Sequence, residues 1–144
     1  MTQRVPEGAI ALERLLRRRR ELGNNLLNID MQERWGSDAQ KAEARRDGLK
    51  LGAEAREVDA ELEALAAATW RAEPDATRAW AAAHVTLLDR FLAETDDDVG
   101  RNVATEERGQ WQEVARGERS CVRGNVFYVR FDPALYEELF GFAA

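Results

Sequence analysis

The first part of the chain repeats apolar residues with the period of a helix. One stripe at spacings of three and four consists of Leu12, Leu15, Arg19, Leu22, Leu26, Ile29 and Glu33, with Leu16 and Leu27 beside it. Such spacing places side chains on one helix face, so it predicts a helix over about residues 8–34. Gly36 is a natural helix end, and Ser37 with Gln40 matches a capping box. We therefore expect a second helix to begin near Ser37.

The second helix repeats the pattern and predicts an antiparallel hairpin. Its stripe consists of Leu51, Ala55, Val58, Leu62 and Leu65, after the small residues Ala44 and Gly48. Arms of this kind would be about 40 to 48 Å long, which exceeds what a compact domain of this size needs. The hairpin should therefore project from the body or be covered by a partner, for which a second copy in a dimer is the simplest choice.

The rest of the chain predicts shorter elements. Pro74 interrupts the helical pattern, and Asp75 is the expected N-cap of a third helix that should end near Ala93. Residues 97–116 favour another helix. The run at 126–131 is almost entirely β-branched or aromatic, and it follows the turn residues RGN, so we expect a short β-hairpin there.

A short terminal helix completes the predicted fold. Asp132 and Pro133 form a capping pair at its start, and Gly141 ends it. The fold class is thus mainly α, with a helical hairpin at 1–71 and, at 72–144, a helical part with a minor β-hairpin. We expect one compact unit rather than two independently folding domains.

Composition and charge limit the possible functions. Apolar residues make up 44% of the 144 residues and charged residues 33%, and no apolar run approaches the roughly 18 residues of a membrane span. We expect no membrane association and no secretory signal. Cys121 is the only cysteine, which favours a reducing, cytoplasmic location. The net charge of −6 is uneven, because residues 1–50 carry +3 and residues 51–144 carry −9.

Four consecutive arginines, Arg17 to Arg20, raise the question of nucleic-acid binding. Four successive helical residues sweep about 300°, so they cannot all face one phosphate backbone. We assign Arg14, Arg17, Arg18 and Arg20 to the outer faces, where they are candidate partner-binding residues. Arg19 lies on the apolar seam and should pair with Glu54 or Glu57 across the hairpin. Nucleic-acid binding by the Arg14–Arg20 segment remains an alternative.

Acidic residues suggest two further possibilities. The loop around Glu94–Asp98 contains acids near Gly100, but no frame matches an EF-hand, so the acids are better explained as the start of the next helix. Glu54 with Glu57 and Glu94 with Asp97 are i, i+3 pairs that could hold Mg²⁺. This resembles in outline the all-α nucleotide pyrophosphohydrolases, and it implies a Mg²⁺-dependent phosphohydrolase as a second alternative.

Other catalytic chemistry has little support in the sequence. His84 is the only histidine and lies on an apolar stripe, which favours a core residue, and no cofactor-binding or catalytic motif is recognised. Six aromatic residues fall within 127–142. We expect most of them in the core, with Phe127, Tyr128, Tyr136 and Phe140 as candidates for a docking surface. The sequence therefore predicts a non-enzymatic protein that binds another protein, or itself as a dimer.

Overall fold

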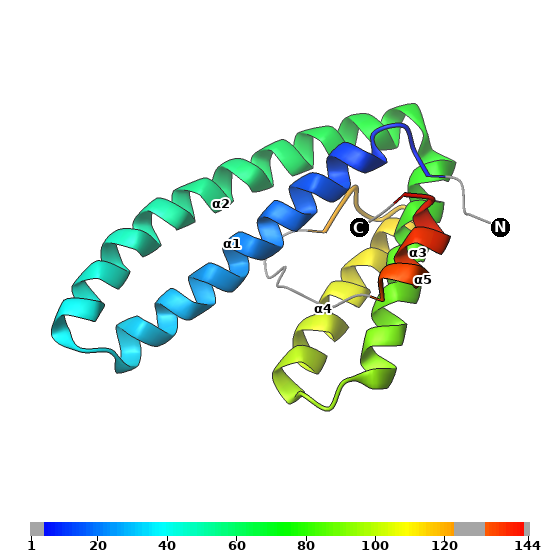
Figure 1. Cartoon of the computed structure of the whole chain (residues 1–144). Coiled ribbons are helices and arrows are strands. Elements are labelled where there is room, and N and C mark those ends of the chain that lie inside the picture. The colour runs from blue at the N-terminus through cyan, green and yellow to red at the C-terminus, as the bar shows by residue number, and fades with distance from the viewer. Residues whose placement is uncertain (1–4, 123–131, 143–144) are drawn as a thin grey trace.

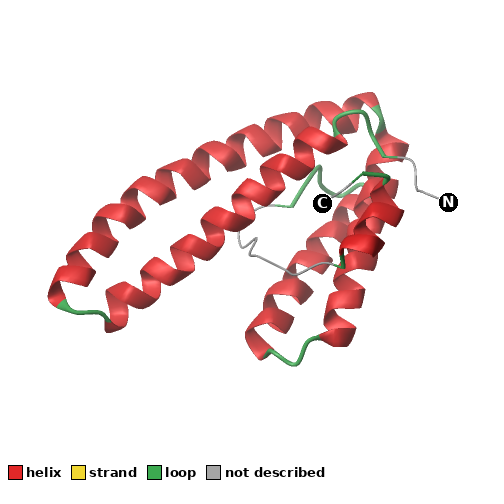
Figure 2. Ribbon diagram, in the orientation of Figure 1, coloured by secondary structure: helices red, strands yellow, loops and turns green. Residues whose placement is uncertain are grey.

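A computed structural model describes residues 5–122 and 132–142, and the described residues form five helices joined by short loops. The helices are α1 (Ala9–Trp35), α2 (Asp38–Ala72), α3 (Pro74–Glu94), α4 (Asp98–Ala115) and α5 (Pro133–Phe140). The described part contains no strand (Figure 2). The mainly α fold class is thus confirmed, whereas the β-hairpin predicted at 126–131 lies outside the described residues.

The chain folds as two antiparallel helix pairs and a short fifth helix. Helices α1 and α2 lie side by side along the long hairpin, and α3 and α4 form a second, shorter pair beside its inner half (Figure 1). Helix α5 lies against α3. The outer half of the hairpin extends away from α3 and α4, as its predicted length requires (Figure 1).

The helix ends follow the capping signals in the sequence. Gly36 ends α1, and the Ser37 hydroxyl accepts from the Gln40 backbone N–H while the Gln40 side chain accepts from the Ser37 backbone N–H. Asp132 caps α5, and Gly141 ends it at a φ of 80°, a left-handed conformation that glycine adopts without a steric penalty. Helix α3 begins at Pro74, so the capping position is Glu73 rather than Asp75.

The apolar core lies where the inner half of the hairpin meets the other helices. It joins side chains of α1 and α2, such as Leu12 and Leu62, to Trp80 and Leu88 of α3 and Trp111 of α4. In the outer half, α1 and α2 approach each other closely at a small residue of α2. A Cβ added to Gly48 would lie 3.4 Å from the side chain of Ile29 on α1. Among the described residues, no helix combines the length and apolarity needed to span a membrane.

Candidate functional site

A buried polar cluster ties four helices together at the centre of the molecule. Glu13 of α1 accepts hydrogen bonds from Trp80 Nε1 of α3 at 2.8 Å and from the Tyr136 hydroxyl of α5 at 2.7 Å. Its Oε1 also contacts His84 Nε2. The His84 ring stacks on Trp111 of α4, with centroids 4.0 Å apart and planes 4° from parallel. His84 is the core histidine that the sequence predicted.

A second carboxylate extends this cluster along α1 and α4. Glu107 forms two hydrogen bonds of 2.6 Å with the Nη1 and Nη2 atoms of Arg20, and it also accepts from Trp111 Nε1 at 3.0 Å. The Glu107 side chain has no exposed surface and that of Arg20 is 7% exposed. Two parallel charge-assisted bonds are the strongest arrangement available to a guanidinium and a carboxylate. The pair therefore fixes α1 against α4 inside the core.

The cluster also sets the electrostatics of Glu13. Burial alone would raise the pKa of this carboxyl group, because it disfavours the charged form. The charge of His84 and the hydrogen bonds from His84, Tyr136 and Trp80 outweigh burial, so the pKa of Glu13 lies below its ordinary value. Burial and the neighbouring Glu13 raise the pKa of the Tyr136 hydroxyl, so this group keeps its proton and donates a hydrogen bond to the Glu13 carboxylate.

This cluster has the composition of acid–base chemistry but the burial of a structural core. The His84 side chain is 1% exposed and Phe140 lies 5.0 Å from its ring, so no substrate reaches the imidazole while α5 is in place. His84 Nδ1 has no hydrogen-bond partner among the described residues. Burial raises the pKa of the Cys121 thiol to about 12, which disfavours the reactive thiolate.

The structure separates the arginines that the sequence grouped as outward-facing. Arg14, Arg17 and Arg18 are exposed, and Arg18 pairs with Glu54 at 2.9 Å and with Glu21 at 3.7 Å. Arg20 was predicted to face outward, and this prediction is wrong because Arg20 is buried against Glu107. A continuous basic face of four arginines is therefore not present on α1.

The seam arginine has a different partner from the one expected. Arg19 Nε lies 2.8 Å from Asp59 Oδ1, whereas Glu54 bonds Arg18 and Glu57 is exposed. The register follows from where the two helices first meet. Arg45 lies nine residues after Gly36, yet it pairs at 3.6 Å with Glu33, which lies only three residues before Gly36, so a symmetric count from the turn gives the wrong register. Arg19 is consequently level with Asp59, two residues beyond Glu57.

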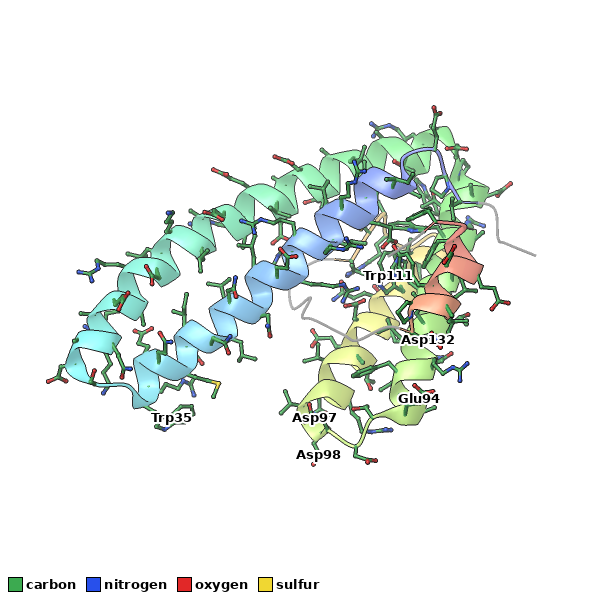
Figure 3. All side chains as sticks on the ribbon, viewed as in Figure 1. Trp35, Glu94, Asp97, Asp98, Trp111 and Asp132 are labelled. Atoms are coloured by element: carbon green, nitrogen blue, oxygen red, sulfur yellow. The ribbon has the colours of Figure 1, made fainter. Side chains whose placement is uncertain are left out.

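The remaining predicted site residues do not form one site. Tyr136 and Phe140 are 3% and 2% exposed and belong to the core, while Phe127 and Tyr128 lie outside the described residues. Glu94 and Asp97 lie at the turn between α3 and α4, far from Trp111 (Figure 3). Asp97 caps α4 by accepting from two backbone N–H groups. Across residues 5–122 and 132–142, no three His, Cys, Asp or Glu side chains converge as metal ligands.

The surface feature that sequence reasoning missed lies on the outer half of α1. At spacings of three and four, the residues Asn24, Leu27, Met31 and Trp35 share one helix face, with Asn28 beside them; we call these five residues the uncharged strip. Leu27 is 40% exposed, Met31 49% and Trp35 74%. Trp35 stands at the outer end of the hairpin (Figure 3).

Comparison of the chain with known protein families, with curated proteins and with solved structures found no match.

Proposed function

We propose that this is a non-enzymatic protein that acts by binding another protein chain through the outer half of its helical hairpin. The observation that carries the proposal is the uncharged strip. It continues the α1 face that holds Glu13, Leu16 and Arg20 against the other helices, but its own side chains are exposed. Large apolar side chains arranged in one exposed row are typical of a protein-binding face.

The stability of the fold should depend little on this row. Its side chains are exposed, while the core is closed by the inner half of α1 together with α2 to α5. Exposed residues away from the core change the free energy of unfolding by about 0.5 kcal/mol or less when substituted. A role in binding therefore explains the strip better than a role in folding.

Crosslinking in intact cells tests the proposal. A photoreactive amino acid in place of Met31 should give discrete crosslinked products in cells that produce the full chain. The matched control is the same amino acid at Ala42, which is exposed in the outer half of the hairpin on the face of α2 turned away from α1. No product from position 31, or identical products from both positions, would contradict the proposed function.

Two finer statements belong to the same proposal. A homodimer is the form that we favour, for the reasons given in the next subsection, and a reducing compartment such as the cytoplasm suits a single cysteine. Nucleic-acid binding is less well supported, because only Arg14, Arg17 and Arg18 of the candidate arginines are exposed and Arg18 already pairs with two carboxylates.

A further inference from the structure

The uncharged strip stands out against the charge of its surroundings. Its five positions carry no charge in a chain in which 33% of residues are charged, and the neighbouring Asp30 and Arg34 pair with each other at 3.2 Å. Cores of protein interfaces are depleted of charge and enriched in Trp and Met. The strip has this composition, whereas an ordinary solvent-facing helix surface would carry Lys, Arg, Asp or Glu.

The charge of the outer hairpin favours a second copy as the occupant of the strip. Residues 24–50 contain five acidic and five basic side chains and are neutral, so the chain's net charge of −6 resides entirely in the remainder. Two copies repel each other least when their outer hairpins meet and their bodies lie at opposite ends. A strongly basic partner would instead be attracted to the acidic body, and an acidic one would be repelled by it.

We infer that two copies of this chain associate through their uncharged strips, with the two α1 helices antiparallel and related by a two-fold axis. This inference rests on the proposed function and names its partner. A contact between identical surfaces is closed by such an axis, so it yields a dimer rather than a filament. The strip spans residues 24–35, about 18 Å of helix, which leaves the two bodies apart at opposite ends.

The two-fold axis sets which residues meet. With the axis level with the middle of the strip, Met31 packs against the partner's Leu27, and Trp35 reaches the partner's Asn24. The Met31, Leu27 and Trp35 side chains of the two copies then bury apolar surface against each other. The Asn24 side-chain oxygen accepts a hydrogen bond from the indole N–H of Trp35 in the other copy. Polar residues at such positions also select one register among several, as a buried Asn does in coiled coils.

Charge substitutions at the two facing positions test both the partner and the register. Light scattering of the purified chain over about 1 to 200 µM should give a mass that rises toward twice the 16.3 kDa of one chain. Met31→Lys and Leu27→Glu should each raise the dissociation constant at least about tenfold, because each places two unpaired charges in the contact. An equal mixture of the two variants should regain the dimer, since the lysine introduced in one chain then faces the glutamate introduced in the other.

The control substitution is Ala42→Lys. It adds a charge to the outer hairpin on the face of α2 that is turned away from α1, so it should leave the measured mass unchanged. Circular dichroism spectra of all variants should match the parent chain, because the substituted residues are exposed. Urea unfolding should match as well when it is measured at concentrations low enough for the parent to be monomeric, since dimer formation would itself stabilise the parent. A monomer at every concentration, or dimers of both single variants, would overturn the inference. If the parent is monomeric and position 31 still gives crosslinks in cells, the partner is a different protein and the proposed function stands.

Discussion

Removing one member of the Arg20–Glu107 pair should destabilise the protein more than removing any exposed ion pair. Glu107→Ala leaves a guanidinium that is 7% exposed without its bidentate carboxylate and also removes the acceptor of Trp111 Nε1. Breaking a buried pair in this way costs about 3 to 5 kcal/mol. The lost Trp111 bond, about 1 to 3 kcal/mol alone, overlaps with this figure, because both effects act on one network.

Urea unfolding followed by tryptophan fluorescence measures this cost, because Trp80 and Trp111 are fully buried and report on the cluster. The midpoint should fall without a change in the slope, since the surface exposed on unfolding is similar. A loss of about 3 to 5 kcal/mol is a large share of the roughly 5 to 15 kcal/mol that stabilises a typical domain. A Glu107→Ala variant that is already partly unfolded without urea would therefore also agree with the prediction.

Two comparisons separate a buried charge from a general packing defect. The double variant Arg20→Leu, Glu107→Leu removes both charges and should be more stable than Glu107→Ala, because no buried guanidinium is then left without its bidentate carboxylate. The exposed pair Arg18–Glu54 provides the control, and Glu54→Ala should cost about 1 kcal/mol or less. Equal costs for Glu107→Ala and Glu54→Ala would refute the buried network.

The other expectations concern protonation, reactivity and nucleic acid. Since the pKa of Glu13 is lowered by folding, its ionised form contributes stability above pH 4.5 that is lost as the pH falls below this value, and the difference in unfolding free energy between the parent and Glu13→Gln should shrink over that range. Cys121, with its pKa raised to about 12, should react with a thiol reagent at pH 8 far more slowly in the native protein than in urea, and equal rates would contradict its burial. Anisotropy titrations should show no DNA or RNA binding tighter than roughly 10 µM near physiological salt; tighter, salt-sensitive binding that is lost in the Arg14, Arg17, Arg18 to Gln variant would instead support the nucleic-acid alternative.

The hairpin and its ends could be predicted because the signals for them are local. The α1 stripe that faces α2 repeats an apolar side chain every three or four residues, and Ser37 with Gln40 marks the start of α2 within four residues of sequence. The register across the hairpin is not local in this sense. It depends on how far α2 runs before Arg45 reaches Glu33, and a count from Gly36 places Arg19 too close to Glu57.

The buried cluster could not be predicted because its partners lie far apart in the chain. Arg20 and Glu107 are 87 residues apart, and Glu13 and Tyr136 are 123 apart. On α1 alone, Glu13 and Arg20 have the pattern of a solvated face, since charged residues are almost never fully buried unless they are paired. Only the arrangement of α3, α4 and α5 supplies the pairing groups, and no periodicity in the sequence encodes that arrangement.

One face of α1 combines both parts of the molecule. The inner half of this face contains two charged residues, Glu13 and Arg20, whose side chains are 10% and 7% exposed and bond groups of the other helices. The outer half of the same face is the uncharged strip, which is exposed. This is the reverse of the distribution that water alone would favour, because solvation stabilises charged side chains outside and apolar ones inside. In the inner half, hydrogen bonds and ion pairs from the other helices offset the cost of removing Glu13 and Arg20 from water. The outer half has no such compensation in the described chain, and a second α1 face of the same composition would provide it.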